Sequence, residues 1–290
     1  MHIAVIGDIV LDILMWSCQR LGDAVVCSES YMDAGGSSNI AIALKRLGAD
    51  KVYAVGLVGC DSAGDIVVKS LREENIDTSF IARHGSTSKV IAYEIDNGVR
   101  YVASIHRLLG SNVLEIDWGM FDIAIVNGNT ATDLSSIDTL IVLVRELPRY
   151  VDLVAIDLGY GAYVDSFINA IMGLDSPLTK KIVVLGTENE ISRLSTNPID
   201  LSRRFMMIAM KMGSRGAKLY VEGRELFIEA RKIDVRPIRT ISAGDVFTAT
   251  LVLCIYRGFD YRTCLELACR AAEKKIVLGL IGRTIPRLED

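Results

Sequence analysis

The middle of the chain alternates short apolar runs with longer segments whose apolar residues recur at helical spacing, and this alternation constrains the fold more than any other feature. The predicted strands and helices of this region lie near 121–126, 134–147, 152–156, 163–173, 181–185 and 199–211. Strands that alternate with helices pair in parallel, and helices cover both faces of the sheet. We therefore predict an α/β fold whose ligands bind beyond the carboxyl ends of the strands.

The two ends of the chain extend the same pattern. Residues 1–8 form a short apolar run that ends in a turn residue, as is typical of a buried parallel strand. Further predicted elements are strands at 51–57 and 79–82, a hairpin of strands 217–221 and 225–229, and helices at 62–74, 245–257 and 261–278. The turn after Ile6 lacks Gly-x-Gly-x-x-Gly, which argues against a dinucleotide-binding fold. We expect a single domain over residues 1–290.

Composition limits the classes of partner. Of the 290 residues, half are hydrophobic and 23% are charged, and the net charge is −4. The Lys and Arg residues are scattered, so the chain lacks the basic stripe of a nucleic-acid-binding protein. No run approaches the ~20 apolar residues of a membrane helix, and the apolar run at 3–6 is too short for the core of a signal peptide. We expect a cytoplasmic protein with small-molecule partners, no nucleic acid and no membrane.

The six cysteines form no Cys-x-x-Cys pair and lie mostly within apolar or helical patterns. We therefore predict free, buried thiols rather than disulfides or metal ligands. The three histidines are too few and too scattered for a zinc site.

Two blocks of alternating polarity predict half-exposed strands outside the main pattern. One block lies near 24–33. The other spans 88–104 and contains Asp96-Asn97-Gly98, and Asn-Gly between two alternating runs is a strong hairpin signal.

A turn of small residues at 239–245, Arg-Thr-Ile-Ser-Ala-Gly-Asp, leads directly into the apolar run 246–256. Such a turn at the start of a helix leaves backbone N–H groups unpaired, and the helix macrodipole adds positive potential at the same spot. A phosphate group binds well there, and Asp245 is close enough to act as a general base on an incoming hydroxyl. The alternative is that Asp245 is only a helix N-cap or first-turn residue.

A second turn, far upstream, also opens a predicted helix. Gly35, Gly36 and Asn39 precede or begin a helix that extends to Leu47, and Gly48 closes it. Glycines permit the close approach of a ligand, and the Asn39 amide offers a donor and an acceptor to hydroxyl groups. The alternative is a turn with an Asn N-cap.

Together, the turns at 34–48 and 239–245 resemble the two signature segments of the ribokinase-like carbohydrate kinases, the phosphofructokinase B (PfkB) family. They occur in the family's order and separation, over essentially the whole chain. The resemblance implies a three-layer αβα sandwich with a mostly parallel central sheet, and a small β lid formed by the strands near 24–33 and 88–104. It also implies transfer of the ATP γ-phosphate to a hydroxyl of a sugar or nucleoside.

The resemblance carries roles to the later turn. It assigns Asp245 as the general base and the backbone of Ser242, Ala243 and Gly244 as the anion hole. We also expect the N–H group of Asp245 to face the transferred phosphoryl group.

For the acceptor, the resemblance points to Asp12, Gly35, Gly36, Asn39, Asn112 and Arg107. Asn112 ends a Gly-Ser-Asn segment similar to a Gly-Ala-Asn that lines the sugar pocket in many members. Arg107 matches an arginine that meets an anionic substrate group in related 2-keto-3-deoxygluconate kinases, although a surface arginine is the simpler interpretation. Asp12 is alternatively a solvated loop residue.

For the nucleotide, the segment Thr187 to Glu190 resembles an Asn-x-x-Glu whose Glu helps to hold the water shell of Mg²⁺. Glu190 matches that Glu, and its alternative is an acidic residue favoured at a helix start. The glycine-containing turn at 211–216 resembles the family's nucleotide turn, which assigns Lys211, Gly213 and Gly216 to ATP. It is not a Walker A loop.

Two departures from the family pattern leave a second function open. Arg239 replaces an Asp, and Ser242 replaces a Gly. A non-catalytic regulator that binds nucleotide or sugar is therefore the alternative to a kinase. The acceptor's identity, the use of ADP in place of ATP, and the oligomeric state are not determined by the sequence, although exposed lid strands favour a homodimer.

Overall fold

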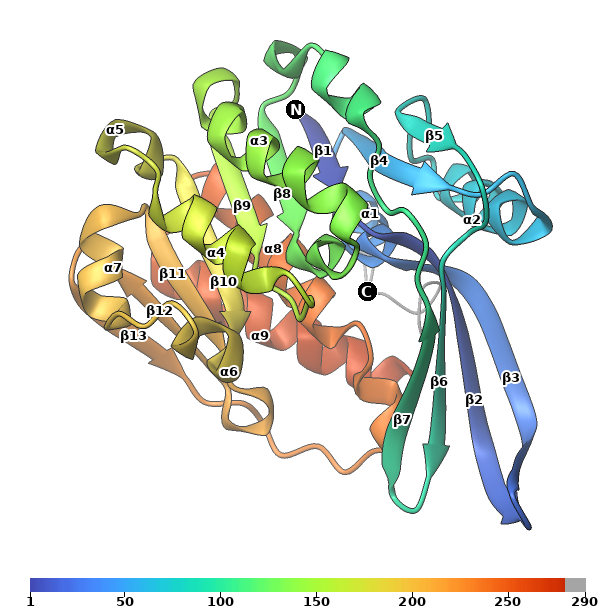
Figure 1. Cartoon of the computed structure of the whole chain (residues 1–290). Helices are drawn as coiled ribbons and strands as arrows, with labels where there is room; N and C mark the ends of the chain where they lie inside the picture. The colour runs from blue at the N-terminus through green and yellow to red at the C-terminus, as the bar shows by residue number, and fades with distance from the viewer. Residues whose placement is uncertain (280–290) are drawn as a thin grey trace.

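The computed structural model describes residues 1–279, and within this range nine strands form one large sheet (Figure 1). Its strands are β1 (His2–Ile6), β4 (Lys51–Val58), β5 (Ile81–Arg83), β8 (Ile123–Asn127), β9 (Leu153–Asp157), β10 (Ile182–Thr187), β11 (Met207–Lys211), β12 (Ala217–Val221) and β13 (Arg224–Ile228). Their order is β13-β12-β11-β10-β9-β8-β1-β4-β5. The strands from β11 to β5 are parallel, and β12 and β13 close one edge as an antiparallel hairpin. The mostly parallel sheet predicted from the sequence is confirmed.

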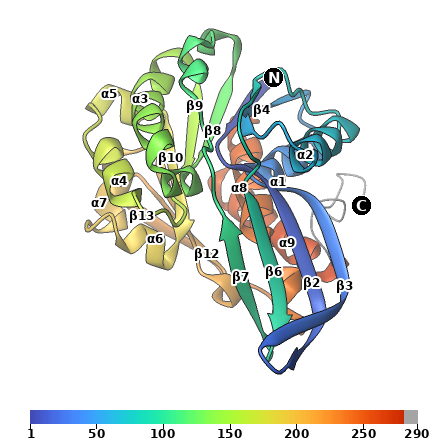
Figure 2. The same cartoon turned by 45° about the vertical axis from the view of Figure 1, so that its right-hand side comes forward.

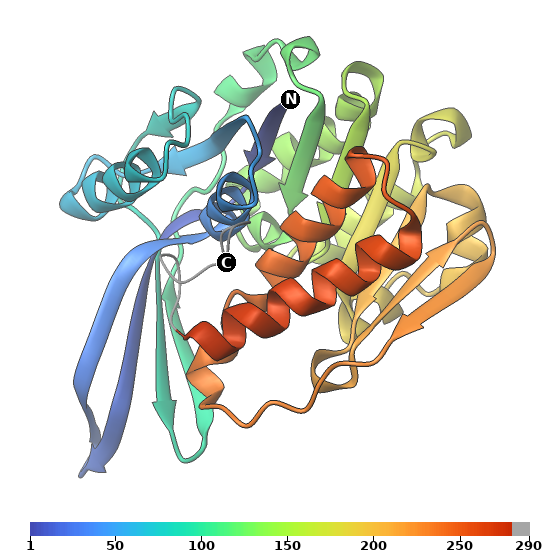
Figure 3. The same cartoon turned by 180° about the vertical axis from the view of Figure 1, so that it is seen from behind.

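Helices cover both faces of this sheet. On one face lie α1 (Ser37–Arg46), α2 (Ser62–Glu73), α8 (Ala243–Tyr256) and α9 (Tyr261–Leu278). Figure 3, in which the molecule is seen from behind, shows α8 and α9 (orange to red) in front of the sheet. On the other lie α3 (Leu134–Tyr150), α4 (Val164–Met172), α6 (Glu188–Ser192) and α7 (Pro198–Arg204), with the short α5 (Ser176–Thr179) before β10. Side chains of β1 alternate between the two cores, Ile3 and Val5 in one and Ala4 and Ile6 in the other. The three-layer sandwich is confirmed.

A separate four-stranded sheet projects from one end of the molecule (Figures 1 and 2). It contains β2 (Ile9–Leu21), β3 (Ala24–Gly36), β6 (Lys89–Ile95) and β7 (Gly98–Ser104), in the order β3-β2-β6-β7. We call it the lid. The hairpin predicted at Asp96-Asn97-Gly98 is confirmed, because β6 and β7 are antiparallel with Ile95 opposite Gly98. The two turn residues, Asp96 and Asn97, have φ values of 51° and 58°, as a type I′ turn requires. The first lid strand, β2, was not predicted, because its base is continuously buried while its tip is exposed.

One predicted helix is wrong. The segment 199–211 divides into the short helix α7 and the strand β11, with a break at Phe205 and Met206. β11 is a short apolar run inserted between β10 and β12 and is almost completely buried. A short apolar run fits a buried strand as well as a buried helix, so periodicity alone did not distinguish them.

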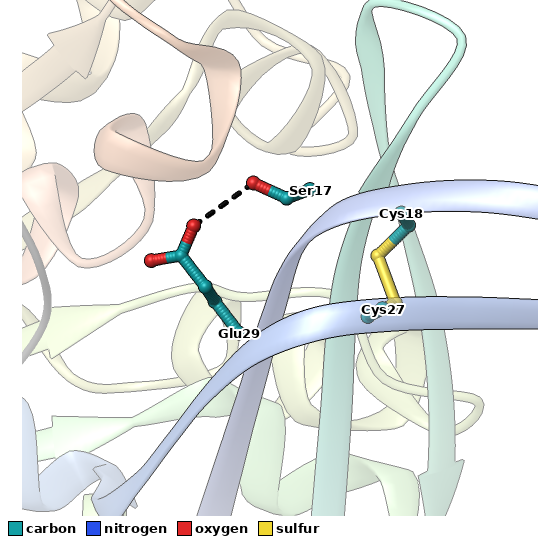
Figure 4. Close-up of a disulfide and its surroundings, with 4 residues drawn as sticks. All are labelled: Ser17, Cys18, Cys27 and Glu29. Atoms are coloured by element: carbon teal, nitrogen blue, oxygen red, sulfur yellow. Dashed lines mark hydrogen bonds between the residues drawn. A yellow bond between two sulfur atoms is a disulfide. The ribbon is translucent and has the colours of Figure 1, made fainter.

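The prediction of free thiols is wrong for two of the six cysteines. Cys18 and Cys27 form a disulfide between β2 and β3 (Figure 4). They are directly opposite each other in the antiparallel ladder, and a hydrogen bond from Ser17 Oγ to Glu29 Oε1 (3.0 Å) joins the same two strands. Because β2 was not foreseen, this register was not visible in the sequence. The remaining four cysteines are free, as predicted, but only Cys264 and Cys269 are buried, because Cys60 is exposed and Cys254 is partly buried.

Within the described residues, one segment, Pro237–Tyr256, is long and apolar enough to cross a membrane, so the expectation that no run approaches this length is wrong. Its most apolar stretch is 67% buried inside the fold, and it contains α8, which packs against α1 and α9. Burial in the core accounts for its apolar composition.

Candidate active site

Ends of parallel strands meet the start of α8 at one place. Asp157, the last residue of β9, accepts two hydrogen bonds from Lys211 Nζ at the end of β11, at 2.9 and 2.6 Å. Asp157 Oδ2 also accepts a hydrogen bond from Thr248 Oγ1 of α8, at 2.7 Å. Burial opposes the charged form of Lys211, but the Asp157 carboxylate outweighs it, so the pKa of Lys211 lies above its usual value.

The turn before α8 presents three free backbone N–H groups. Ser242 has φ 63° and ψ 4°, a left-handed conformation, and its carbonyl accepts hydrogen bonds from the N–H groups of Asp245 and Val246, both at 3.1 Å. Among the described residues, no hydrogen-bond acceptor faces the N–H groups of Ser242, Ala243 or Gly244. Consecutive free amides at a helix start form an anion-binding cradle. The expectation that the Asp245 N–H joins this cradle is wrong, because that group is already bonded within the turn.

Asp245 remains partly accessible in the first turn of α8. Burial and the Asp157 carboxylate raise its pKa to about 7, while Lys211, Lys275 and a hydrogen bond with Asn39 act in the opposite direction. A carboxyl group with such a pKa accepts a proton readily near neutral pH. Of the alternative interpretation, the N-cap part is wrong, because Ser242 occupies the N-cap position, whereas the first-turn part is confirmed.

The predicted acceptor residues at the base of the lid lie beside Asp245. Asp12 is 7% exposed, and its pKa is raised to about 7 by burial and by Asp245, against a hydrogen bond with Asn39. Gly35 leaves room for this carboxyl group, because a Cβ at Gly35 would lie 2.0 Å from Asp12 Cγ. Gly36 is the N-cap of α1 with φ 61°, so both predicted glycines meet a steric need. Asp12 is therefore a buried residue of strand β2 and not a solvated loop residue.

Two buried oxygen atoms near these carboxyl groups have no hydrogen-bond partner among the described residues, Asp8 Oδ1 and Asn39 Oδ1. Asp8 follows β1 and is 8% exposed. Burial, and then the charges of Asp245 and Asp12, raise its pKa well above its usual value. Unsatisfied buried acceptors carry a large energetic cost unless a ligand or water supplies donors. We call Asp8, Asp12, Asn39 and Asp245 the acceptor cluster.

A pocket of about 360 Å³ opens on the other side of the start of α8. Its polar end contains Thr187, Lys211, Thr240 and the backbone of Ala243 and Gly244. The rest of its wall is largely apolar and includes Gly213, Gly216, Ala217, Ala230, Ile233, Val235, Phe247, Ala272 and Ile276. The predicted nucleotide residues therefore share one pocket with Ala243 and Gly244, two of the three residues with free amides, and Asp245 of the acceptor cluster is the next residue in the chain.

Thr187 and Glu190 form a capping box at the start of α6. The Thr187 N–H donates to Glu190 Oε2 at 2.7 Å, and the Glu190 N–H donates to Thr187 Oγ1 at 3.4 Å. Glu190 is 4% exposed, and burial raises its pKa. The helix-start alternative therefore accounts for Glu190 Oε2. The other carboxylate oxygen, Oε1, takes no part in the capping box.

Within the described part of the chain, no hydrogen bond or ion pair joins two of the predicted acceptor residues, Arg107 and Asn112, to the acceptor cluster. Arg107 is exposed, and among the described residues no carboxylate pairs with it. Asn112 is exposed in a 3-10 turn (Ser111–Glu115), where its Oδ1 approaches Gly110. Their roles stay predictions.

Sequence reasoning missed Asp8, Asp157 and Lys275. Asp8 and Asp157 had a usable signal, because each stands at the carboxyl end of a predicted parallel strand. Lys275 had none, because it occupies an ordinary position in a predicted helix.

Comparison with known proteins gives the family. The model of the pfkB family carbohydrate kinases matches residues 1–107 and 183–278, which include both signature turns. Fructosamine kinase FrlD of Bacillus subtilis is 25% identical over 284 residues, covering 93% of this chain and 95% of that protein. A putative ribokinase structure from Agrobacterium tumefaciens has a TM-score of 0.79 at 20% identity and covers 99% of this chain and 95% of that one.

The structure of Arabidopsis thaliana ribokinase complexed with ribose and ATP has a TM-score of 0.74 at 18% identity, and covers 99% of this chain and 96% of that one. These structural likenesses establish a shared fold. The match of the family model to both signature turns establishes more: this chain belongs to the pfkB family of carbohydrate kinases.

Proposed function

We propose that this protein transfers the γ-phosphate of ATP to a hydroxyl group of a sugar or nucleoside. One arrangement supports the proposal: Ala243 and Gly244, whose N–H groups are free, line the pocket, and Asp245 of the acceptor cluster follows them directly in the chain. A phosphoryl group that leaves the pocket toward the cluster meets these donors on its way. ATP fits the pocket, because an apolar wall suits a purine and the polar end suits phosphates.

In the proposed reaction, Asp245 takes the proton of the acceptor hydroxyl while that oxygen forms a bond to the γ-phosphorus. The bond from phosphorus to the β,γ-bridging oxygen breaks, and ADP leaves with the electron pair. The N–H groups of Ser242, Ala243 and Gly244 donate hydrogen bonds to the transferring phosphoryl oxygens. Asp12 and Asn39 orient the acceptor.

Mg²⁺ fits this site as an ion carried by the nucleotide. Among the described residues, no group of three or more His, Cys, Asp or Glu side chains is placed to hold a metal, and Mg²⁺ commonly keeps several waters and binds substrate phosphates. When bound, it neutralises charge on the phosphate oxygens. We propose that Glu190 Oε1 holds one of its waters.

The test replaces Asp245 by Asn and measures ADP release with a panel of sugars and nucleosides. Loss of the base should lower kcat by at least ~10²-fold with little change in ATP affinity. Asp65→Asn is the matched control, because Asp65 is also a first-turn helix residue but is exposed and paired with Arg83. Near-normal turnover of the Asp245 variant would refute the mechanism.

The alternative of a non-catalytic regulator rests on the two departures from the family pattern, Ser242 and Arg239. The backbone geometry at both residues argues against this alternative. Ser242 adopts a left-handed conformation, which glycine takes most readily, and keeps its N–H free. Arg239 contributes its carbonyl to the turn's contact with Lys275. Binding of ATP and a sugar without phosphorylation of any panel member would favour the regulator.

We further propose that the acceptor is a sugar carrying an amine. The unpaired atoms of the acceptor cluster are hydrogen-bond acceptors, and the charges of Asp8, Asp12 and Asp245 oppose one another's ionisation. A protonated amine supplies both donors and a compensating charge. The match to a fructosamine kinase supports this class. Fructosamine against fructose, and glucosamine against glucose, test it: equal kcat/KM within both pairs would contradict an amine-bearing acceptor and leave the kinase proposal intact.

We also propose a cytoplasmic homodimer that pairs through the lid. Exposed apolar side chains of the lid, Leu21, Val26, Met32, Tyr101 and Val102, favour burial against a second copy. A monomeric mass in solution scattering would contradict the dimer. The Cys18–Cys27 disulfide is unusual for a reducing compartment, so mass analysis of thiols alkylated in intact cells tests the location.

A further inference from the structure

Lys275 is a completely buried lysine in the last turn of α9, with 0% of its surface exposed. Its Nζ donates hydrogen bonds to the carbonyl oxygens of Arg239, at 2.8 Å, and Ile241. Among residues 1–279, its hydrogen-bond partners are thus neutral carbonyls, and no carboxylate forms an ion pair with it. Burying an ammonium group without a paired carboxylate is expensive, and an apolar side chain of similar size would fill the same space at lower cost. A stability role alone therefore explains this lysine poorly.

The two carbonyls belong to the turn that carries the anion-binding amides. The carbonyl of Ile241 and the N–H of Ser242 are the two ends of one peptide group. The described chain contains no cis peptide bond, and in a trans peptide the C=O and N–H point in opposite directions. Holding the Ile241 carbonyl toward α9 therefore directs the Ser242 N–H away from α9. A cation on the carbonyl also polarises the peptide and strengthens its N–H as a donor.

The turn also needs support for its backbone conformation. Ser242 is a non-glycine residue at φ 63°, in the left-handed region where a side chain is strained. Its Oγ is buried and has no hydrogen-bond partner among the described residues, so its own side chain does not hold the turn. The two bonds from Lys275 fix the residues just before Ser242.

We propose that Lys275 is a positioning residue that serves as a built-in cation, fixing and polarising the turn whose N–H groups bind the transferred phosphoryl group. This inference rests on the proposed phosphoryl transfer. Electrostatics around the residue are consistent with it: burial lowers the pKa of Lys275 to about 8, and the Asp245 carboxylate acts against that fall. The ammonium form is therefore the main form at neutral pH.

The test removes the ammonium group and offers a free cation in its place. Lys275→Ala leaves a space lined by two carbonyl oxygens, and such oxygens coordinate K⁺ or NH₄⁺. In buffer whose only small cation is Na⁺, we expect kcat of the variant to fall by at least ~10²-fold, the scale of a lost anion-hole donor. KCl or NH₄Cl at equal ionic strength should restore at least ~10-fold, because a free cation replaces the lost contact.

Two controls separate this role from simple structural damage. Wild type and Lys274→Ala, which removes the same charge from the neighbouring position of α9, should respond less than ~2-fold to the same salts, because each keeps the built-in cation. Lys275→Gln keeps amide donors but no charge, so it should stay folded and still lose at least ~10-fold in kcat.

The outcomes are decisive. Cation rescue confined to Lys275→Ala supports the proposal. A Lys275→Gln enzyme with wild-type kcat, or a loss in Lys275→Ala that follows its folded fraction and ignores K⁺ and NH₄⁺, overturns it. A wild type that phosphorylates no acceptor contradicts the proposed function instead.

Discussion

Replacement of Gly35 by Ala tests whether Asp12 binds the acceptor. Gly35 is a buried residue of β3, and a Cβ there would lie 2.0 Å from Asp12 Cγ and 2.1 and 2.2 Å from its two carboxylate oxygens. These distances are far below van der Waals contact, so the Asp12 carboxyl group must move. Because Gly35 has an ordinary strand backbone, the substitution introduces no conformational strain of its own.

The magnitude follows from the interactions that Asp12 gives up. Hydrogen bonds to a charged group contribute about 1.5–3 kcal/mol, which corresponds to a rise of about 10- to 150-fold in the KM for the acceptor. The KM for ATP should stay within about 2-fold, because Gly35 and Asp12 are not among the residues that line the nucleotide pocket.

The assay measures initial rates of ADP formation over a matrix of acceptor and ATP concentrations. Gly119→Ala is the control, because Gly119 is exposed and the nearest atom to its added Cβ is Asp117 Oδ1 at 3.3 Å. An unchanged acceptor KM in the Gly35 variant would refute the role of Asp12. An equal rise in both KM values would indicate general distortion instead.

Three further perturbations follow from charge and covalent structure. Because Asp245 must be ionised to act as a base and its pKa is about 7, kcat/KM should fall about tenfold per pH unit below that value in a pH–rate profile; a flat profile between pH 5 and 7 would exclude this base. The folded-state pKa values of Asp12 and Asp245, about 7, exceed the unfolded value of about 3.9, so the folded state binds more protons and its stability should decline as pH rises from about 4 to 7. In a plot of Tm against pH, Asp12→Asn should have a shallower decline than the wild type. An unchanged slope would contradict the raised pKa of Asp12. Non-reduced denatured protein should titrate four thiols, from Cys60, Cys254, Cys264 and Cys269, whereas six would contradict the disulfide; its reduction removes up to about 3 kcal/mol of stabilisation by loop-closure entropy.

The layers of the fold were predictable because each depended on a local pattern. Strands such as β9 and β10 are short and continuously apolar, and the helices between them carry apolar residues at helical spacing. The exceptions lack such a pattern. β2 changes from fully buried to exposed along its length, and β11 is an apolar run that fits either state. The disulfide depended on the register of the unpredicted strand.

The site was predictable where backbone chemistry required particular residues. Gly35 and Gly36 sit where a Cβ would collide with Asp12 or with the backbone of Asp8, and Gly244 lies at a helix start where free amides are expected. Lys275 was not predictable, because a lysine in an amphipathic helix is normally solvated. Its role depends on the packing of α9 against the turn at 239–241, which brings its ammonium group to the carbonyl oxygens of Arg239 and Ile241.

Lys211 and Lys275 both oppose the rise in the pKa of Asp245, but they differ in their own partners. This difference predicts how the pKa of Asp245 changes when each lysine is replaced. Lys211 forms an ion pair with Asp157, whereas no carboxylate in the described part of the chain pairs with the built-in cation Lys275. Lys211→Met would leave the charge of Asp157 uncompensated, and that charge raises the pKa of Asp245. The acid limb of the pH–rate profile should therefore move to higher pH in this variant, as it also should in Lys275→Gln, where a second opposing charge is lost. The doubly substituted Lys211→Met, Asp157→Asn protein removes both charges and should return the limb toward its wild-type position. A limb that stays displaced in the double variant would show that Lys211 acts on Asp245 through geometry and not through charge.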